Sequence, residues 1–286
     1  GIGVMATAST PLSEGWQRRF GGIARLYGIS AAERLASAHF VVIGLGGVGS
    51  WAAEALARTG VGALTLIDPD EICLSNINRQ LPALANTAGE AKAEVLAARL
   101  AQINPELRLD CRLEFLTKDN LEQLLPACDG IVDAIDQVGA KTALLNHAKR
   151  SKVNLIVTGG AGGQRDPRLL ACADLSQTYN DPLLAKVRNN LRRHYGFPRD
   201  GKKFGIECVY SSEPLRYPGK DGESCSAKID AARDDNAPLR LDCASGFGAV
   251  TMVTASFGML AAARLIERFL AKTPAPALPP AGEWHG

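Results

Sequence analysis

The stretch His39-Phe-Val-Val-Ile-Gly-Leu-Gly-Gly-Val-Gly49 is an apolar run that leads directly into a G-x-G-G-x-G turn. The residues that follow, near 50–60, have a helical pattern. Glycines at 44, 46, 47 and 49 remove side chains that would block a phosphate, and amides at the start of the next helix can donate to it. A tight turn without a ligand would also explain glycines, but a strand, this turn and a helix in succession predict a nucleotide site.

Similar alternation continues on either side of this turn. Strands are predicted at 40–43, 63–67, 107–113, 130–134 and 155–158, with helices near 50–60, 87–103, 118–126 and 139–151. This order predicts an α/β fold with a Rossmann-like, doubly wound, mostly parallel sheet. Residues 159–242 are less regular apart from a helical segment near 182–195, and we interpret them as an insertion over the carboxyl edge of the sheet.

A single domain over residues 14–272 is expected from a chain of 286 residues, of which 46% are hydrophobic. We expect residues 1–13 and the proline-rich tail at 273–286 to be disordered. The stretch 244–266 has one charge, Arg264, and is long enough for a membrane span. Because it is rich in Gly, Ser, Thr and Ala, we favour a buried C-terminal apolar helix at 248–271 and expect no contact with a membrane.

The cysteines and the overall charge restrict the class of protein. The seven cysteines are widely spaced and form no C-x-x-C pair, so neither a disulfide framework nor a zinc site is indicated. The start of the chain lacks the pattern of a signal peptide, and we expect a cytoplasmic protein. With a net charge of +2, any nucleic-acid contact must come from a local basic patch.

Asp68 follows the second predicted strand, where an acid typically accepts hydrogen bonds from ribose hydroxyls. A turn cap is the alternative role for this residue. Up to this point an NAD-dependent oxidoreductase explains the pattern equally well, because it uses the same turn and the same acid.

Cations soon after Asp68 favour ATP over a dinucleotide. Arg79 offers a planar fork and Lys92 a point charge, and both suit phosphates whose charge changes during a reaction. Asn76 and Asn78 add neutral polar groups for phosphate or for metal-bound water. Ordinary surface charge would explain Arg79 or Lys92 alone, but together with the glycine turn they predict an ATP site.

Two acids near the end of a later strand are candidates for magnesium chemistry. Asp136 lies just past that strand, at the edge where ligands of open α/β sheets bind, and could hold Mg²⁺ with the triphosphate. Asp133, three residues earlier, could assist it.

These motifs together resemble the adenylation core of the ThiF/MoeB/ubiquitin-activating enzyme superfamily, which activates a carboxylate as an acyl-adenylate. The resemblance covers Gly44 to Gly49, Asp68, Asn76-Ile-Asn-Arg-Gln80, Lys92 and Asp136. It implies that these residues, Gln80 included, bind ATP, and that Arg79, Lys92 and Asp136 are catalytic. The zinc-binding cysteine pairs common in sulfur-carrier-activating members are missing.

Finer motifs resemble the tRNA-modifying branch of this superfamily. They are Trp16-Gln-Arg-Arg-Phe-Gly-Gly22, Ala24-Arg-Leu-Tyr-Gly28, Gly159-Gly-Ala-Gly-Gly-Gln164 and Asp242-Cys-Ala-Ser-Gly-Phe-Gly248. The resemblance implies ATP-dependent dehydration of a threonylcarbamoyl-modified adenosine in tRNA, through adenylation of the threonine carboxylate and ring closure, with release of AMP and pyrophosphate. It also implies a homodimer, in which Arg19 or Arg25 reaches the ATP of the partner.

The last of these motifs contains Cys243, for which the superfamily offers a thioester or persulfide role in a cysteine-desulfurase sulfur relay. A small buried residue is the alternative. The same loop could offer carbonyls to a monovalent cation.

A basic run is the candidate tRNA contact. It comprises Lys186, Arg188, Arg192, Arg193, His194, Arg199, Lys202 and Lys203, and a solvated helix face is the alternative. Three other functions remain open: activation of a ubiquitin-like sulfur carrier, an NAD-dependent oxidoreductase, and a sulfur-transfer scaffold that acts through Cys243.

Overall fold

The computed structural model describes residues 11–226 and 246–272. Residues 1–10 and 273–286, which belong to the two ends that we expected to be disordered, lie outside the described residues, and so does Cys243. In the described part, Ser13 caps the first helix with a side-chain hydrogen bond to Trp16 N at 3.0 Å.

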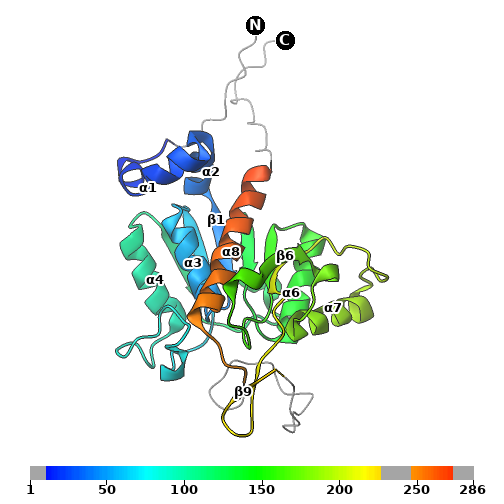
Figure 1. Ribbon diagram of the computed structural model, residues 1–286. Coiled ribbons are helices and arrows are strands. Elements are labelled where there is room, and N and C mark those ends of the chain that lie inside the picture. Colours follow the sequence, from blue (N-terminus) through cyan, green and yellow to red (C-terminus); the bar gives the residue numbers. More distant parts are fainter. Residues whose placement is uncertain (1–10, 227–245, 273–286) are drawn as a thin grey trace, which may run out of the picture.

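The centre of the fold is a sheet in which the described residues form seven strands, in the order β3-β2-β1-β4-β5-β7-β6 (Figure 1). The strands are β1 His39–Ile43, β2 Ala63–Ile67, β3 Arg108–Arg112, β4 Gly130–Asp133, β5 Leu155–Thr158, β6 Leu170–Asp174 and β7 Glu207–Ser211. All pairings are parallel except that of β6 with β7. The order reverses between β1 and β4, and ligands of open α/β sheets bind outside the carboxyl ends of such strands.

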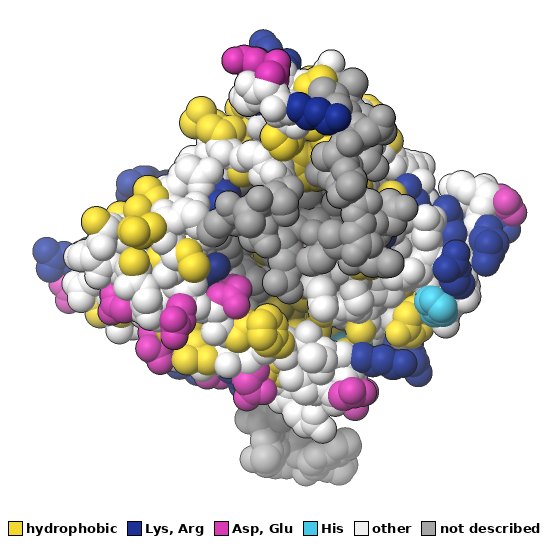
Figure 2. Space-filling model, turned by 90° about the horizontal axis from the view of Figure 1, so that it is seen from below, with side chains coloured by type: hydrophobic (Ala, Val, Ile, Leu, Met, Phe, Trp, Pro, Cys, Tyr) yellow, Lys and Arg dark blue, Asp and Glu magenta, His cyan; other side chains and the backbone are white. Residues whose placement is uncertain are grey.

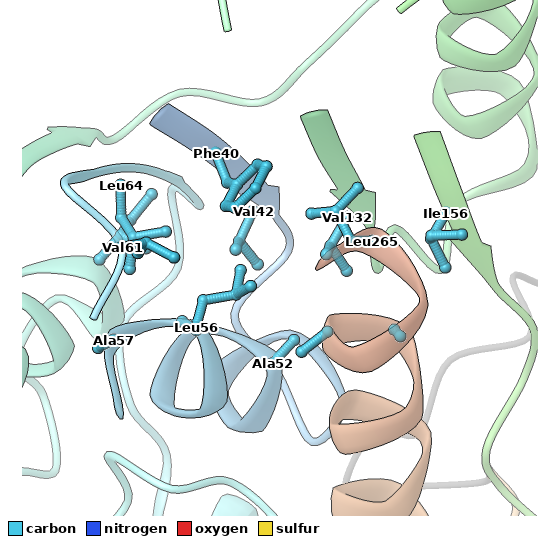
Figure 3. Packing of buried hydrophobic residues seen from close by; sticks show 14 of the residues in the cluster. Phe40, Val42, Ala52, Leu56, Ala57, Val61, Leu64, Val132, Ile156 and Leu265 are labelled. Atoms are coloured by element: carbon cyan, nitrogen blue, oxygen red, sulfur yellow. The ribbon is translucent and has the colours of Figure 1, made fainter. Parts of the chain in front are cut away.

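Helices cover both faces of this sheet because each strand sends alternate residues to opposite sides. The described helices are α1 Glu14–Tyr27, α2 Ile29–Ser37, α3 Gly49–Arg58, α4 Lys92–Ile103, α5 Leu121–Leu124, α6 Val138–Ser151, α7 Pro182–Tyr195 and α8 Thr251–Ala271, of which α1 packs at the amino edge of the sheet and not on a face. Phe40, Val42 and Val132 face α3 and α8, where Leu56 and Leu265 pack against them (Figure 3). The other face packs against α5, α6 and α7.

The C-terminal apolar helix is confirmed, and one of its faces is buried. Along α8, Val253, Phe257, Ala261 and Leu265 are fully buried at helical spacing against α3 and the sheet. A Cβ at Gly258 would lie 2.4 Å from Val48 O, so this glycine lets α8 lie against the start of α3. In the residues described, no helix has the length and apolarity needed to cross a membrane.

The region 159–242 is more regular than its sequence indicated. Its β7 pairs parallel with β5, and β6 adds an antiparallel edge strand, so part of the expected insertion extends the central sheet. The short β8 Tyr217–Pro218 and β9 Ser224–Cys225 form a separate hairpin at the bottom of Figure 1. The edge strand β6 has no clear sequence signal, because it is only partly buried and shows no alternation.

Two helix boundaries also differ from the predictions. The helix expected at 87–103 begins at Lys92, after a turn in which Gly89 has a φ of 89°. The helix expected at 118–126 is a single turn, α5. At the amino edge, α1 is fixed by Trp16, whose Nε1 donates to Gly60 O at 2.8 Å.

Candidate ATP site

The glycine turn after β1 packs so closely against neighbouring backbone atoms that Gly44 and Gly49 cannot be replaced by a residue with a Cβ. Gly44 has a φ of 87°, and a Cβ there would lie 2.6 Å from Ala134 O. A Cβ at Gly49 would lie 1.6 Å from Gly44 O. The first helical turn of α3 therefore starts directly against the end of β1, with its amide groups at the carboxyl edge of the sheet.

The other two glycines bring the Asn76–Gln80 segment against this turn. A Cβ at Gly46 would lie 3.5 Å from Gln80 Nε2, and one at Gly47 would lie 3.0 Å from Arg79 Cγ. The glycine turn and the predicted phosphate-binding segment therefore lie side by side, as expected from the sequence.

Asp68 holds the backbone of the glycine turn. Its Oδ2 accepts a hydrogen bond from Leu45 N and its Oδ1 one from Asp70 N, both at 2.7 Å. Burial raises the pKa of this carboxyl, against the lowering effect of the two amides and of Lys92. Each carboxylate oxygen keeps a second lone pair, so a ribose contact stays a prediction.

Arg79 and Lys92 are both buried cations, with 8% and 7% of their surfaces exposed. Arg79 Nη1 donates to Ser75 O at 3.3 Å and to Asn78 Oδ1 at 3.0 Å. Lys92 is the first residue of α4, and its Nζ lies 4.0 Å from Asp70 Oδ2. Burying cations is costly unless they bind anions, so the two side chains favour an anionic ligand beside the glycine turn.

The two asparagines have structural partners in the described residues. Asn76 Oδ1 accepts from Cys73 N at 2.9 Å and caps the short helix Leu74–Asn76, while Asn78 Nδ2 donates to Ala249 O at 2.9 Å. Direct contact of either with phosphate stays a prediction. The carboxamide of Gln80 is buried, and its Oε1 has no hydrogen-bond partner among the described residues.

The acids after β4 differ sharply from each other. Asp136 is exposed at the carboxyl edge, whereas Asp133 is completely buried and its Oδ2 lies 3.0 Å from Lys141 Nζ. Burial raises the pKa of Asp133, and the Lys141 ammonium opposes this. The expectation that Asp133 assists at magnesium is therefore corrected, because its carboxylate is already paired inside the protein.

Magnesium at this edge would need oxygens from the nucleotide as well as from Asp136. Over residues 11–226 and 246–272, no three His, Cys, Asp or Glu side chains lie close enough to hold a metal by themselves. One carboxylate with phosphate oxygens and waters is a common arrangement for magnesium, so the residues present fit Mg-ATP.

Two further functional candidates, Lys141 and Asp181, were not revealed by the sequence. Lys141 pairs with Asp133, as described above, and Asp181 lies at the start of α7. Asp181 caps α7: its Oδ1 accepts from Leu184 N at 2.9 Å and its Oδ2 from Gly160 N at 3.0 Å. A Cβ at Gly159 would lie 1.9 Å from Asp181 Oδ2, so the loop after β5 closes on this carboxylate. The sequence Asn180-Asp-Pro182 does signal a helix start, but nothing local shows that the acid is buried.

Asp181 is expected to make stability pH-dependent, because burial raises its pKa from 3.8 to about 6. The folded protein then binds a proton that the unfolded chain releases, so this group's stabilising contribution is lost as pH rises from 4 to 6. Relative to Asp181→Asn, which keeps a capping oxygen, the wild type should lose about 2 kcal/mol of unfolding free energy over that range. Urea unfolding at several pH values measures this.

A capping acid nearer the surface, Asp166, supplies the control for that measurement. Asp166 caps the turn Pro167–Leu169, and its neighbour Arg168 lowers its pKa. The wild type should therefore lose no unfolding free energy relative to Asp166→Asn as pH rises from 4 to 6. Parallel pH profiles for the wild type and Asp181→Asn would contradict the prediction.

The N-terminal arginines lie far from this site within one chain. Arg19 and Arg25 belong to α1, which packs at the amino edge, whereas the glycine turn is at the carboxyl edge (Figure 1). Either arginine could reach ATP only on a second copy of the chain.

The basic run divides into two partly buried side chains, Arg188 and Arg192, and a larger exposed group. Arg188 Nη1 donates to Leu175 O and Thr178 Oγ1, each at 3.0 Å, and Arg192 packs over Phe204. The exposed members are Lys186, Arg193, His194, Arg199, Lys202 and Lys203. Figure 2 shows Lys and Arg side chains gathered on the side of the molecule where α7 lies.

The pattern of the ThiF family matches residues 21–280, which is most of the sequence. The chain belongs to the ThiF family. Among its relatives, this ThiF-family chain is 50% identical over 266 residues to tRNA threonylcarbamoyladenosine dehydratase of Escherichia coli K12, covering 92% of this chain and 98% of that protein.

Two crystal structures of the E. coli tRNA N6-threonylcarbamoyladenosine dehydratase show the same fold as this ThiF-family chain. The complex with ATP has a TM-score of 0.79 at 45% identity, covering 91% of this chain and 96% of that one. The complex with AMP also has a TM-score of 0.79 at 45% identity, with 91% and 97% covered.

Proposed function

We propose that this ThiF-family enzyme dehydrates tRNA threonylcarbamoyladenosine to its cyclic form at the expense of ATP. The observation that supports this most strongly is half-identity to the E. coli dehydratase over nearly the full length of both chains. The buried cations beside the glycine turn supply the matching chemistry.

In the proposed reaction, the threonine carboxylate of the tRNA attacks the α-phosphorus of ATP, giving an acyl-adenylate and pyrophosphate. The carbamoyl group of the same nucleoside then attacks the activated carbonyl, which closes the ring and expels AMP. Because the second nucleophile is already held in the substrate, no protein nucleophile is required. The net result is a ligase-type reaction in which loss of one water from the nucleoside is coupled to conversion of ATP to AMP and pyrophosphate.

The chain's own residues would bind and orient the triphosphate. Amides of the glycine turn and of the N-terminus of α3 would donate to the phosphates, and Arg79 and Lys92 would neutralise the charge that develops on them. Asp136 would hold Mg²⁺, which supplies further charge stabilisation when bound. A monovalent cation near 246–249 is a further proposal, although Gly248 O and Ala249 O already accept hydrogen bonds from Gly163 N and Asn78 Nδ2.

The proposed function is tested by measuring pyrophosphate and AMP release from Mg-ATP with three RNA conditions. Release should require tRNA that bears the threonylcarbamoyl group, and should be absent with unmodified tRNA or without RNA. The product nucleoside should be lighter by one water. Stimulation by a diglycine-tailed protein in place of tRNA would instead assign the enzyme to the activators of sulfur carriers.

The two remaining alternatives have their own tests. In an NAD-dependent oxidoreductase the pyrophosphate is only held, so the buried cations Arg79 and Lys92 would have no developing phosphate charge to neutralise, and NAD-dependent absorbance changes would be needed to support that function. A sulfur-transfer scaffold, or a partnership with a cysteine desulfurase, would act through Cys243, which lies outside the described residues. Full ATP-dependent activity of Cys243→Ala would contradict that role.

A tRNA surface is proposed along α7 and the loop after it. The helix starts beside Gly160 at the carboxyl edge, and the chain re-enters the sheet at the amino end of β7. Fourteen helical residues span about 21 Å, so the exposed cations from Arg193 onward lie well away from the ATP site. A tRNA bound there through its phosphates could extend its modified base toward Asp136.

Charge reversal at Arg193 and Lys203 should weaken tRNA binding and flatten its salt dependence. Each lost phosphate contact lowers the slope of log K against log salt by about 0.9. Lys118→Glu, an exposed lysine just after β3, is the matched control and should leave the slope unchanged. Equal slopes for the wild type and Arg193→Glu/Lys203→Glu would exclude this surface.

A homodimer is part of the proposal, with α8 as a candidate interface. Its outward face includes Met252 and Met259, which are 60% and 43% exposed. Such apolar side chains suit a two-fold contact, and a second copy is also what Arg19 or Arg25 needs in order to reach an ATP site. A cytoplasmic location fits a tRNA substrate.

A further inference from the structure

A buried ionic cluster lies directly beneath the carboxyl edge, outside the residues assigned to ATP. It joins Asp133 on β4 to Lys141 on α6, with both side chains completely inaccessible to solvent. Replacing a buried ion pair with apolar groups is often neutral or stabilising, because desolvation offsets the attraction of the charges. Stability is therefore a weak explanation for this pair.

The pair fixes the backbone immediately before Asp136. Lys141 Nζ donates to Ile135 O at 2.8 Å, and Asp133 Oδ1 accepts from Ile135 N at 3.0 Å. Both polar backbone groups of Ile135 are thus held by this one ion pair.

The backbone immediately after Asp136 is also fixed, by the start of α6. Gln137 is the N-cap residue, its carbonyl accepts from Lys141 N at 3.0 Å, and its Oε1 accepts from Ala140 N at 3.4 Å. Asp136 itself is exposed, and among the described residues no hydrogen bond or ion pair is made by its carboxylate. The turn therefore presents one free carboxylate between two rigidly held neighbours.

We propose that Lys141 is a positioning residue for Asp136: its buried ammonium holds the turn after β4 so that the Asp136 carboxylate meets the magnesium of Mg-ATP. This inference rests on the proposed function, which gives Asp136 its role at the metal. The same ammonium opposes the rise in the pKa of Asp181 that burial causes, and Asp181 Oδ2 accepts a hydrogen bond from Gly160 N in the loop after β5.

The test removes the ammonium without leaving a buried charge behind. Lys141→Met alone would leave Asp133 unpaired and destabilise the protein, so Asp133→Asn/Lys141→Met is the informative variant. The asparagine that replaces Asp133 can still accept from Ile135 N, but Ile135 O loses its donor. The control is Glu207→Gln/Arg264→Met, which removes a partly exposed ion pair of 2.6 Å between β7 and α8, on a different part of the sheet. Glu207 also lies 3.6 Å from Arg268 on α8, and the glutamine keeps a side chain of the same shape there.

The readout is the gain in ATP affinity on adding Mg²⁺, measured by calorimetry with and without a chelator. In Asp133→Asn/Lys141→Met this gain should fall by about 10-fold, as it should in Asp136→Asn. Affinity for ATP without metal should stay unchanged, which checks that the ATP site has folded. Adding Asp136→Asn to the double variant should cause no further loss, because the two changes remove the same contact.

The outcomes separate this inference from the function on which it rests. If Asp136→Asn loses the magnesium-dependent gain while Asp133→Asn/Lys141→Met keeps it, Lys141 does not position Asp136 and the proposed function stands. A comparable loss in Glu207→Gln/Arg264→Met would also overturn the inference, since any ion-pair removal would then suffice. If Asp136→Asn keeps the gain, the assignment of Asp136 to magnesium fails, and the role of Lys141 fails with it.

Discussion

Replacing Lys92 with alanine is expected to lower the rate of pyrophosphate release by about 10²- to 10³-fold, the usual effect of removing one group that stabilises transition-state charge. Lys92 is buried at the start of α4, where its ammonium lies 4.0 Å from Asp70 Oδ2. Negative charge grows on the leaving pyrophosphate only as the reaction proceeds, so the rate should fall more than the affinity for ATP.

Single-turnover release of pyrophosphate with threonylcarbamoyl-bearing tRNA measures this effect, and calorimetry with ATP alone measures binding. Lys118→Ala, which removes an exposed lysine beyond β3, is the control and should behave as the wild type. If Lys92→Ala kept a rate comparable to that of Lys118→Ala, Lys92 would be a structural cation and not a catalytic one.

Gly49→Ala should have the largest effect on the folded structure. Its added Cβ would lie 1.6 Å from Gly44 O, a backbone atom that cannot rotate away. Relief requires the glycine turn to separate from the start of α3, so we expect a loss of about 3 kcal/mol or more of unfolding free energy, together with loss of ATP binding. Urea unfolding and calorimetry with ATP measure both.

Gly139→Ala provides a closely matched comparison. Gly139 lies in the first turn of α6, and a Cβ there would meet no atom within 4 Å. Alanine should leave ATP binding intact and stabilise the helix by up to about 1 kcal/mol. If Gly49→Ala were as stable as Gly139→Ala, the turn would be more adaptable than its geometry indicates.

Local sequence patterns were sufficient for the five parallel strands from β1 to β5, apart from small shifts at their ends. They were also sufficient for the glycine turn and for the buried C-terminal helix. These features repeat with periods that the chain displays locally, because a buried strand needs consecutive apolar residues and a helix needs one apolar face. The edge strand β6 has no such signal, since pairing with β7 holds it in place and little of it is buried.

The candidate site shows the same division. Glycines, Asp68, Arg79 and Lys92 could be selected from residue type and order, because phosphate chemistry restricts which groups are useful. For other polar residues, the residue type did not reveal the partner. Asn76 caps its own turn, Asp133 forms a buried ion pair, and Arg188 donates hydrogen bonds to the 175–178 turn. In each case the partner is an ordinary backbone or side-chain group. Any polar residue nearby could have contacted it, so the residue type alone does not predict the contact.

The sequence by itself determined the fold class, the glycine turn and the positions of the cations that follow it, because each depends on neighbours within a few residues or on one repeated period. Only the tertiary structure decided that Lys141 lies between Asp133 and Ile135, that Asp181 closes on Gly160, and that the N-terminal arginines lie at the edge opposite the ATP site. These placements follow from which strand packs beside which helix, and the burial that gives such polar groups their strength exists only once the chain has folded.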